Sequence, residues 1–283
     1  MTEFFRADLH CHSTCSDGTY TPENLIRHAK EQNLNGLSIT DHDTIDAYPI
    51  AIPIAKELGL PLISGAEFSA IQGEVSVHIL AYAFDLNNPV IHQFCQRHQE
   101  RRTRRNRLIL EKLAQHQMPI TEEEINLHTG NHVVHTIGRP HIALAMMKKG
   151  YVASVNDAFK KYLGEGKSCY ASGESFSVEE TIEVIHQAKG FAIIAHPHLL
   201  NDQRTFDKLL TLKFDGIEGN YANFNRDKNA RWIRVGKKRD WIITGGSDFH
   251  GDVKPQIALG SSWVPEETFR FLENHYKEVN NLV

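Results

Sequence analysis

The sequence lacks the features of a membrane or secreted protein. None of its apolar runs is long enough to cross a bilayer, and its N-terminus carries no basic stretch followed by an apolar one. Only 4 of its 283 residues are cysteines, and they form no CxxC pair and no disulfide-like framework. We therefore expect reduced thiols and a cytoplasmic protein with no membrane partner.

A strong charge imbalance is also absent. The formal net charge is −4, so the global balance does not indicate nucleic-acid binding. The apolar and charged fractions are those of a globular protein, and the length allows one large domain or two modest ones. Histidine is unusually frequent, with 17 copies. That number raises the chance of a metal site, and it also makes accidental histidine patterns more common.

One stretch near the N-terminus organises the rest of the chain. Asp8, His10 and His12 alternate at spacing two, and alternate side chains share a face on an extended backbone. Residues 4–7 before them predict a short buried strand, and residues 16–18 after them have turn chemistry. A lone histidine there would more often be a packed or surface residue. Two histidines and an aspartate at this spacing favour a metal site at the end of a strand.

Strand-like and helix-like segments alternate on either side of a purely helical stretch at about 89–172. Besides the first strand, we expect strands at 36–40, 60–64, 75–82, 191–195, 215–218 and 241–244, with helices starting near Thr21, Asp46 and Ser177. Within the helical stretch, Thr121-x-x-Glu124 predicts a capping box. Strands alternating with helices predict an α/β fold with about seven strands, a parallel sheet and helical crossovers.

Most metal-capable side chains fall at or just after the C-terminal end of an expected strand. They are His10, His12, His42, Glu67, His196, Asp248 and His250, and His78, inside a strand, is the partial exception. In a parallel barrel these ends meet on the face that carries the active site. Imidazoles mixed with carboxylates suit manganese, iron or zinc, and more than four candidate ligands imply more than one ion. Multinuclear sites of this kind bind phosphate and activate water, so the sequence predicts metal-assisted phosphoester hydrolysis.

The same residues lie in motifs that resemble those of the PHP (polymerase and histidinol phosphatase) family, in the same order. The motifs are Asp8-x-His10-x-His12, Ser16-Asp17-Gly18, Thr40-Asp41-His42-Asp43, Gly65-x-Glu67, His78, Ala195-His196-Pro197 and Gly246-Ser247-Asp248-Phe249-His250-Gly251. The resemblance covers the chain from end to end. It implies a distorted seven-stranded, TIM-like (β/α)7 barrel from residues 1–88 and 173–283, with residues 89–172 as an inserted helical subdomain.

The resemblance also implies a set of ligands for three divalent ions, with manganese as the first expectation and zinc or iron as alternatives. One ion would bind His10, His12, Glu67 and Asp248, a second Glu67, His78 and His196, and a third Asp17, His42 and His250. Asp8 and Asp41 would be the catalytic residues. They would lie behind the metal ligands and orient the imidazole rings. Many family members have a histidine where Asp17 stands. A carboxylate at this position resembles the subgroup of nucleoside 3′,5′-bisphosphate phosphatases and 5′→3′ exoribonucleases, although Asp17 could also be a simple turn residue.

The helical stretch carries a local excess of positive charge. Its basic run holds Arg97, Arg101, Arg102, Arg104, Arg105, Arg107 and Lys112, opposed by Glu100 and Glu111. Such a run is more often a solvated helix face, but in an acidic protein it is a candidate for contacting a polyanion. The segment 138–143 resembles a further motif of the same subgroup. The candidate substrate-binding residues are Arg102, Arg105, Arg139, His141 and Lys167. Lys167 follows glycines but is not in a P-loop, because Lys161 stands where the first glycine is needed, and it could be a plain surface lysine.

Taken together, these features predict a metal-dependent phosphoesterase. We expect it to remove the 5′-phosphate of a nucleoside 3′,5′-bisphosphate and to act stepwise on the 5′ end of short RNA, with no obligatory protein partner. One alternative is a histidinol-phosphate phosphatase, whose substrate carries one phosphate and a cation and fits a basic insertion poorly. The other is a non-catalytic PHP module that serves a polymerase as a scaffold. The full set of candidate ligands and the lack of polymerase sequence disfavour it.

Overall fold

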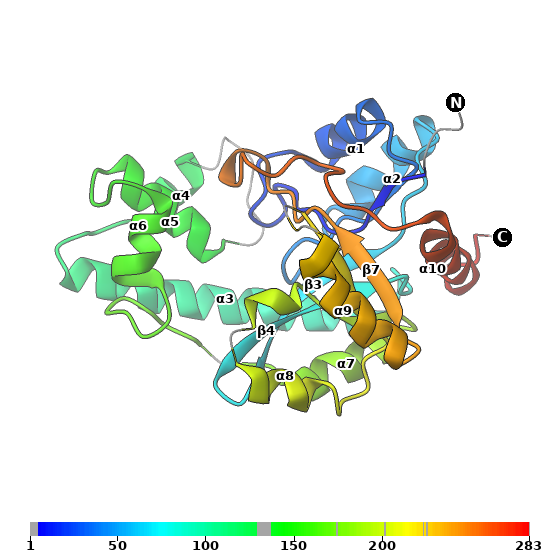
Figure 1. Cartoon of the computed structure of the whole chain (residues 1–283). Helices are drawn as coiled ribbons and strands as arrows, with labels where there is room; N and C mark the ends of the chain where they lie inside the picture. The colour runs from blue at the N-terminus through cyan, green and yellow to red at the C-terminus, as the bar shows by residue number, and fades with distance from the viewer. Residues whose placement is uncertain are drawn as a thin grey trace.

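The computed structural model describes residues 5–128, 137–173, 175–200, 202–222, 224 and 226–282, and it has a mixed α/β fold. Strands β1 (Ala7–Asp8) and β2 (Gly36–Leu37) form a two-stranded parallel sheet. A five-stranded sheet follows in chain order: β3 (Gly65–Gln72), β4 (Val75–Tyr82), β5 (Phe191–Ile194), β6 (Gly216–Tyr221) and β7 (Ile242–Gly246). Figure 1 shows the strands at the centre of the molecule, with helices around them.

The larger sheet is not wholly parallel, so that prediction was wrong for one strand. β4 runs antiparallel to both β3 and β5, whereas β5, β6 and β7 are parallel to one another. Only Gly73 and Glu74 separate β3 from β4, and Gly73 has φ +64°. A two-residue connection can only make a hairpin, because a parallel crossover needs a dozen residues or more.

The strand predicted at 60–64 was also misplaced. The structure has a single bridge there, from Leu62 to Leu37, and the strand proper begins at Gly65. Residues 65–72 pair along their whole length with β4. This pairing determines where the strand lies more strongly than the short apolar run before it does. Glu67 therefore lies inside β3 instead of following a strand end.

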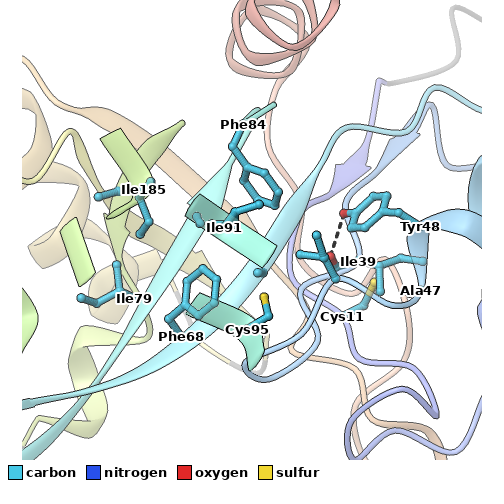
Figure 2. Close-up of a cluster of buried hydrophobic side chains, with 14 of the residues drawn as sticks. Cys11, Ile39, Ala47, Tyr48, Phe68, Ile79, Phe84, Ile91, Cys95 and Ile185 are labelled. Atoms are coloured by element: carbon cyan, nitrogen blue, oxygen red, sulfur yellow. Dashed lines mark hydrogen bonds between the residues drawn. The ribbon is translucent and has the colours of Figure 1, made fainter. Parts of the chain in front are cut away.

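Helices pack around the sheets. They are α1 (Pro22–Glu31), α2 (Tyr48–Glu57), α7 (Val178–Gln187), α8 (Gln203–Leu209), α9 (Arg226–Lys238) and α10 (Glu266–Val279). In the main core, Figure 2 shows Phe68 and Ile79 of β3 and β4 near Ile185 of α7. On its other side the Tyr48 hydroxyl donates a hydrogen bond to the Ile39 carbonyl at 2.8 Å. This packing buries the strands β3 and β4, which carry Glu67 and His78.

The described part of residues 89–172 is helical and has no strand. It comprises α3 (Pro89–Gln115), α4 (Glu122–His128), α5 (Arg139–Lys148), α6 (Val155–Ala158) and a π-helical turn, η1 (Phe159–Leu163). The predicted capping box is confirmed, because Thr121 and Glu124 bond each other's backbone N–H groups. The first half of α3 packs into the main core through Ile91, while Ile109 and Leu113 of its second half belong to a separate cluster. Figure 1 shows α4, α5 and α6 gathered at one side of the molecule.

All four cysteines are buried free thiols. Within the described ranges, none of the helices combines the length and the apolarity that a membrane span requires.

Candidate metal centre

Two distant motifs are held side by side by backbone hydrogen bonds. Asp248 N donates to His10 O at 2.7 Å, and His12 N donates to Phe249 O at 2.9 Å. The segment after β1 therefore runs beside the segment after β7. As predicted from the alternation, the His10 and His12 rings point toward a common centre, with ring centroids 5.3 Å apart.

Glu67 lies at that centre, with imidazoles on both of its carboxylate oxygens. Its Oε1 is 2.8 Å from His78 Nδ1 and 2.7 Å from His196 Nε2. Its Oε2 is 3.4 Å from His10 Nε2, 3.3 Å from His12 Nε2 and 3.2 Å from His42 Nδ1. The two oxygens thus face two different groups of nitrogen donors, which is the arrangement a shared carboxylate ligand needs.

Asp17 forms a second focus of the same cluster. Its Oδ1 is 3.4 Å from His250 Nε2 and 3.7 Å from His12 Nδ1, and its Oδ2 is 3.7 Å from His42 Nε2. Asp248 Oδ1 lies 3.3 Å from His12 Nε2, between the two foci. All nine predicted ligands are therefore brought together, and His12 contacts both foci.

The donor atoms fit divalent ions. His12 Nδ1, His12 Nε2 and His42 Nδ1 are buried and make no hydrogen bond with any group that the structure describes. Burial lowers the pKa of His42 to about 3 and that of His250 to about 4, so both imidazoles are neutral at pH 7 and can donate a lone pair. Although burial opposes it, the surrounding imidazoles hold the pKa of Glu67 well below its usual range. Buried nitrogens without partners beside ionised carboxylates are the donor set that manganese, iron or zinc prefers.

Asp8 and Asp41 hold loops instead of contacting imidazole nitrogens. Asp8 accepts backbone hydrogen bonds from Ser247 at 2.9 Å and Gly260 at 2.8 Å, and burial raises its pKa to about 6. Asp41 accepts from Ser13 N at 2.7 Å and from Ser16 Oγ at 2.5 Å. The two carboxylates therefore fix the loops from which the ligands project.

A cavity of about 220 Å³ opens beside the cluster, between β3, β4 and the inserted helices. Asp17, His42 and His78 line one wall, and Arg101, Arg102, Arg105 and Arg139 line another, with Glu74 and Glu165 also present. The predicted basic residues Arg102, Arg105 and Arg139 are thus brought to the cluster, and the first two are buried. We call this space the arginine cavity.

Its arginines are only partly neutralised. Arg102 donates to Asp43 Oδ2, with its Nε at 2.7 Å. Arg105 donates to the neutral acceptor Asn106 Oδ1 at 3.0 Å, and Arg139 stacks over Tyr170 with 5.4 Å to the ring centroid. Burial, reinforced by Arg102 and Arg139, lowers the pKa of Arg105 well below its usual range. Guanidinium groups that destabilise one another in this way would be stabilised by an anion in the cavity.

Known proteins resemble this chain along most of its length. The family model described as the PHP domain matches residues 8–163. The 5′-3′ exoribonuclease Rnm of Salmonella typhimurium is 34% identical, over 91% of this chain and 89% of that protein. The 3′,5′-nucleoside bisphosphate phosphatase of Chromobacterium violaceum is 30% identical, over 86% of each. A solved structure assigned as a metal-dependent phosphoesterase from Bifidobacterium adolescentis superposes with a TM-score of 0.85 at 33% identity, covering 95% of this chain and 96% of that one.

The chain belongs to the PHP family. Together with the histidine and carboxylate cluster, this membership assigns it to the metal-dependent phosphoesterases.

Two of the predicted substrate-binding residues of this PHP protein do not line the arginine cavity. His141 is buried at the start of α5, where its Nδ1 accepts a hydrogen bond from Gly138 N at 2.9 Å. It is close enough to Asp17 to help lower the pKa of that carboxyl. Lys167 is exposed. Neither is among the residues that surround the cavity.

Three residues that touch the PHP ligands were missed by the sequence analysis. Glu218 is buried in β6; its Oε1 is 2.8 Å from His10 Nδ1, and its Oε2 accepts from His196 N at 2.6 Å. Tyr221 and Lys254 both donate to Asp248 Oδ2, at 2.6 and 2.7 Å. Glu218 ends the strand expected at 215–218, so its strand-end position was a usable signal. The other two have no signal in the sequence.

Proposed function

We propose that this PHP protein hydrolyses the 5′-phosphate of nucleoside 3′,5′-bisphosphates and acts from the 5′ end on short RNA. The observation that best supports this proposal is the position of the arginine cavity. Asp17, His42 and His78 line the cavity and also belong to the metal-capable cluster. This pair of sites favours a substrate with two phosphates, one bound at the cluster and the other in the cavity.

We further propose three divalent ions, with manganese first, on the ligand sets implied by the family resemblance. When bound, such ions acidify water and neutralise phosphoryl oxygens. The chain's own part is to hold the donors. Glu67 offers Oε1 to the side of His78 and His196 and Oε2 to the side of His10 and His12, which supports its role as the shared ligand. Asp17 supports a separate third position, because it faces His42 and His250.

The predicted barrel and its insertion also belong to this proposal. One single bridge joins Leu37 of β2 to Leu62, just before β3, and another joins His42, after β2, to Glu67 of β3. Another joins Cys11 to Phe249, linking the segment after β1 to the segment after β7. These bridges support one distorted seven-stranded barrel built from residues 1–88 and 173–283, with residues 89–172 inserted.

The arginine cavity favours this function over its nearest alternative. A histidinol phosphate would bring one phosphate and an ammonium group, and the buried Arg105 and the half-buried Arg139 would repel that cation. A nucleoside bisphosphate would instead bring a second anion to the same place.

Phosphate release with Mn²⁺ tests the function directly. The panel is adenosine 3′,5′-bisphosphate, adenosine 5′-monophosphate, histidinol phosphate and a 5′-phosphorylated RNA of a few nucleotides. We expect the bisphosphate to give the highest kcat/KM and the RNA to be shortened from its 5′ end. A preference for histidinol phosphate, or no hydrolysis of any nucleotide, would refute the proposal.

Removing one cavity arginine should change discrimination more than chemistry. Arg139→Ala should lower kcat/KM for the 3′,5′-bisphosphate by about 10- to 100-fold, because a charge-assisted contact contributes roughly 1.5–3 kcal/mol. The 5′-monophosphate should be affected far less. Arg107→Ala, an exposed position on α3, is the control and should change neither substrate. Equal losses on both substrates would mean that Arg139 grips the reacting phosphate or holds the fold.

Removing the carboxylate behind two ligands should weaken metal binding. The Glu218 carboxylate contacts the ring of His10 and accepts a hydrogen bond from the backbone N–H of His196. His196 has an unusual φ of +22°. Glu218→Gln should lower metal affinity by about 10- to 100-fold, measured by Mn²⁺ titration of metal-free protein, and high Mn²⁺ should restore activity. The exposed Glu179→Gln is the control. A parent-like affinity in Glu218→Gln would contradict this role.

A further inference from the structure

Three aromatic side chains gather beside the metal centre, away from the arginine cavity. The His198 ring centroid lies 4.4 Å from that of Tyr221 and 4.3 Å from that of Phe224, and Tyr221 and Phe224 are 5.4 Å apart. All three side chains are only half-buried. The Lys228 ammonium lies 5.1 Å from the Phe224 ring centroid. We call these three residues the aromatic face.

The aromatic face is directly joined to the cluster. The His196 ring lies 6.3 Å from His198 and 6.5 Å from Tyr221, and the Tyr221 hydroxyl donates to Asp248 at 2.6 Å. A hollow of about 190 Å³ is lined by His78 and His196 together with Leu199, which is 56% exposed. The surface beside these ligands is thus apolar and aromatic, in contrast to the arginine cavity beside His42.

Packing alone does not account for this arrangement. A purely structural aromatic cluster would bury its rings, whereas these three side chains stay half-buried beside His196 and Asp248, and Lys228 lies next to Phe224. Half-exposed rings next to a cation are the composition of surfaces that bind single-stranded nucleic acid, where each base stacks on a ring.

We propose that the aromatic face binds the nucleobase of the nucleotide whose 5′-phosphate lies at the metal centre. This inference rests on the proposed function and adds a base site to it. A ribose carries its base on C1′ and its 3′-phosphate on C3′, so the two groups leave the sugar in different directions. With the 5′-phosphate at the cluster, the structure offers one matching surface for each group, the aromatic face beside His196 and the arginine cavity beside His42.

Stacking recognises the ring area of a base instead of its hydrogen-bonding edge. The site would therefore accept every base and hold purines more tightly than pyrimidines. Phe224 is the residue to test, because Tyr221 contacts Asp248 and His198 contacts His196, which are both predicted ligands.

The experiment compares two substrates at saturating Mn²⁺: adenosine 3′,5′-bisphosphate and the same ribose bisphosphate without a base. Phe224→Ala should lower kcat/KM for the adenosine substrate by about tenfold or more, mainly through KM, which is the effect of losing one base–aromatic stack. The baseless substrate should be unaffected, and Phe224→Trp should retain the parent values. Phe271→Ala removes a more exposed phenylalanine of α10, 51% exposed, which packs against Phe191 of β5, and it should change neither substrate.

Each other outcome has a definite meaning. Unchanged adenosine kinetics in Phe224→Ala would overturn the base site, and so would an equal loss on both substrates, since Phe224 would then only support the loop. A parent that hydrolyses the baseless substrate as well as the nucleotide would overturn the base site and leave the phosphatase proposal standing. A parent that hydrolyses neither would overturn the proposed function together with this inference.

Discussion

Replacing Glu67 by alanine should lower kcat/KM by about 10³-fold or more while the chain stays folded. The two carboxylate oxygens of Glu67 together lie within 3.4 Å of five imidazoles, those of His78 and His196 at Oε1 and those of His10, His12 and His42 at Oε2. Losing one group that stabilises transition-state charge typically costs 10²–10³ in rate. A ligand shared between two ions should cost more, because both ions lose a donor.

Elemental analysis after metal loading checks the cause of that loss. We expect close to three ions per chain in the parent and a loss affecting two of them in Glu67→Ala, with little change in far-UV circular dichroism. Glu57→Ala, an exposed glutamate on α2, should keep the parent's ions and activity. A parent that is fully active with one ion or none would refute the multinuclear site.

The cluster was predictable because its signal is local. His10 and His12 alternate on one short segment, and Asp248 and His250 do the same on another, so spacing and turn chemistry are enough to place them. Strand ends in an α/β barrel meet on one face, so the position of each segment at a strand end is enough to predict that the segments meet. His42 and His196 follow from the same rule.

The errors arose where pairing between distant segments decided the outcome. Glu67 was expected after a strand that ended at Ser64, but pairing with β4 moved the strand to 65–72. Glu67 and His78 nonetheless lie together, with Glu67 Oε1 2.8 Å from His78 Nδ1. The partners of Arg102 were not predictable, since α3 is 27 residues long and nothing in its sequence states which of its faces meets the ligand loop after β2.

The face of α3 that carries Arg102 meets Asp43. Replacing Asp43 should cause the largest change in stability. Asp43 is fully buried and has φ +59° directly after His42. Its Oδ2 accepts from Arg102, its Oδ1 lies 3.1 Å from His98 Nδ1, and Ser69 N donates to it at 2.7 Å. One carboxylate therefore ties the ligand loop to both β3 and α3.

Asp43→Asn should lower the free energy of unfolding by about 3–5 kcal/mol, because it leaves the buried Arg102 charge unpaired. For a chain of this size the melting temperature should fall by roughly 10 °C. Although burial opposes ionisation, Arg102 and His98 hold the pKa of Asp43 well below its usual range. Its contribution is therefore fully present above the ordinary carboxyl pKa of about 4, and it is lost only as the pH falls through the lowered folded pKa. Denaturant unfolding should show a constant difference between parent and variant from about pH 5 to pH 8.

A surface pair on the same helix provides the control. Glu100 is 55% exposed and lies 3.9 Å from Arg104, so Glu100→Gln should cost about 0–1 kcal/mol. Adding Arg102→Met to Asp43→Asn should restore part of the lost stability, because the double variant no longer buries an unpaired charge. If the double variant is less stable than Asp43→Asn by the full cost of a further buried side chain, the arginine is held by its packing, and Asp43 does not act through its charge.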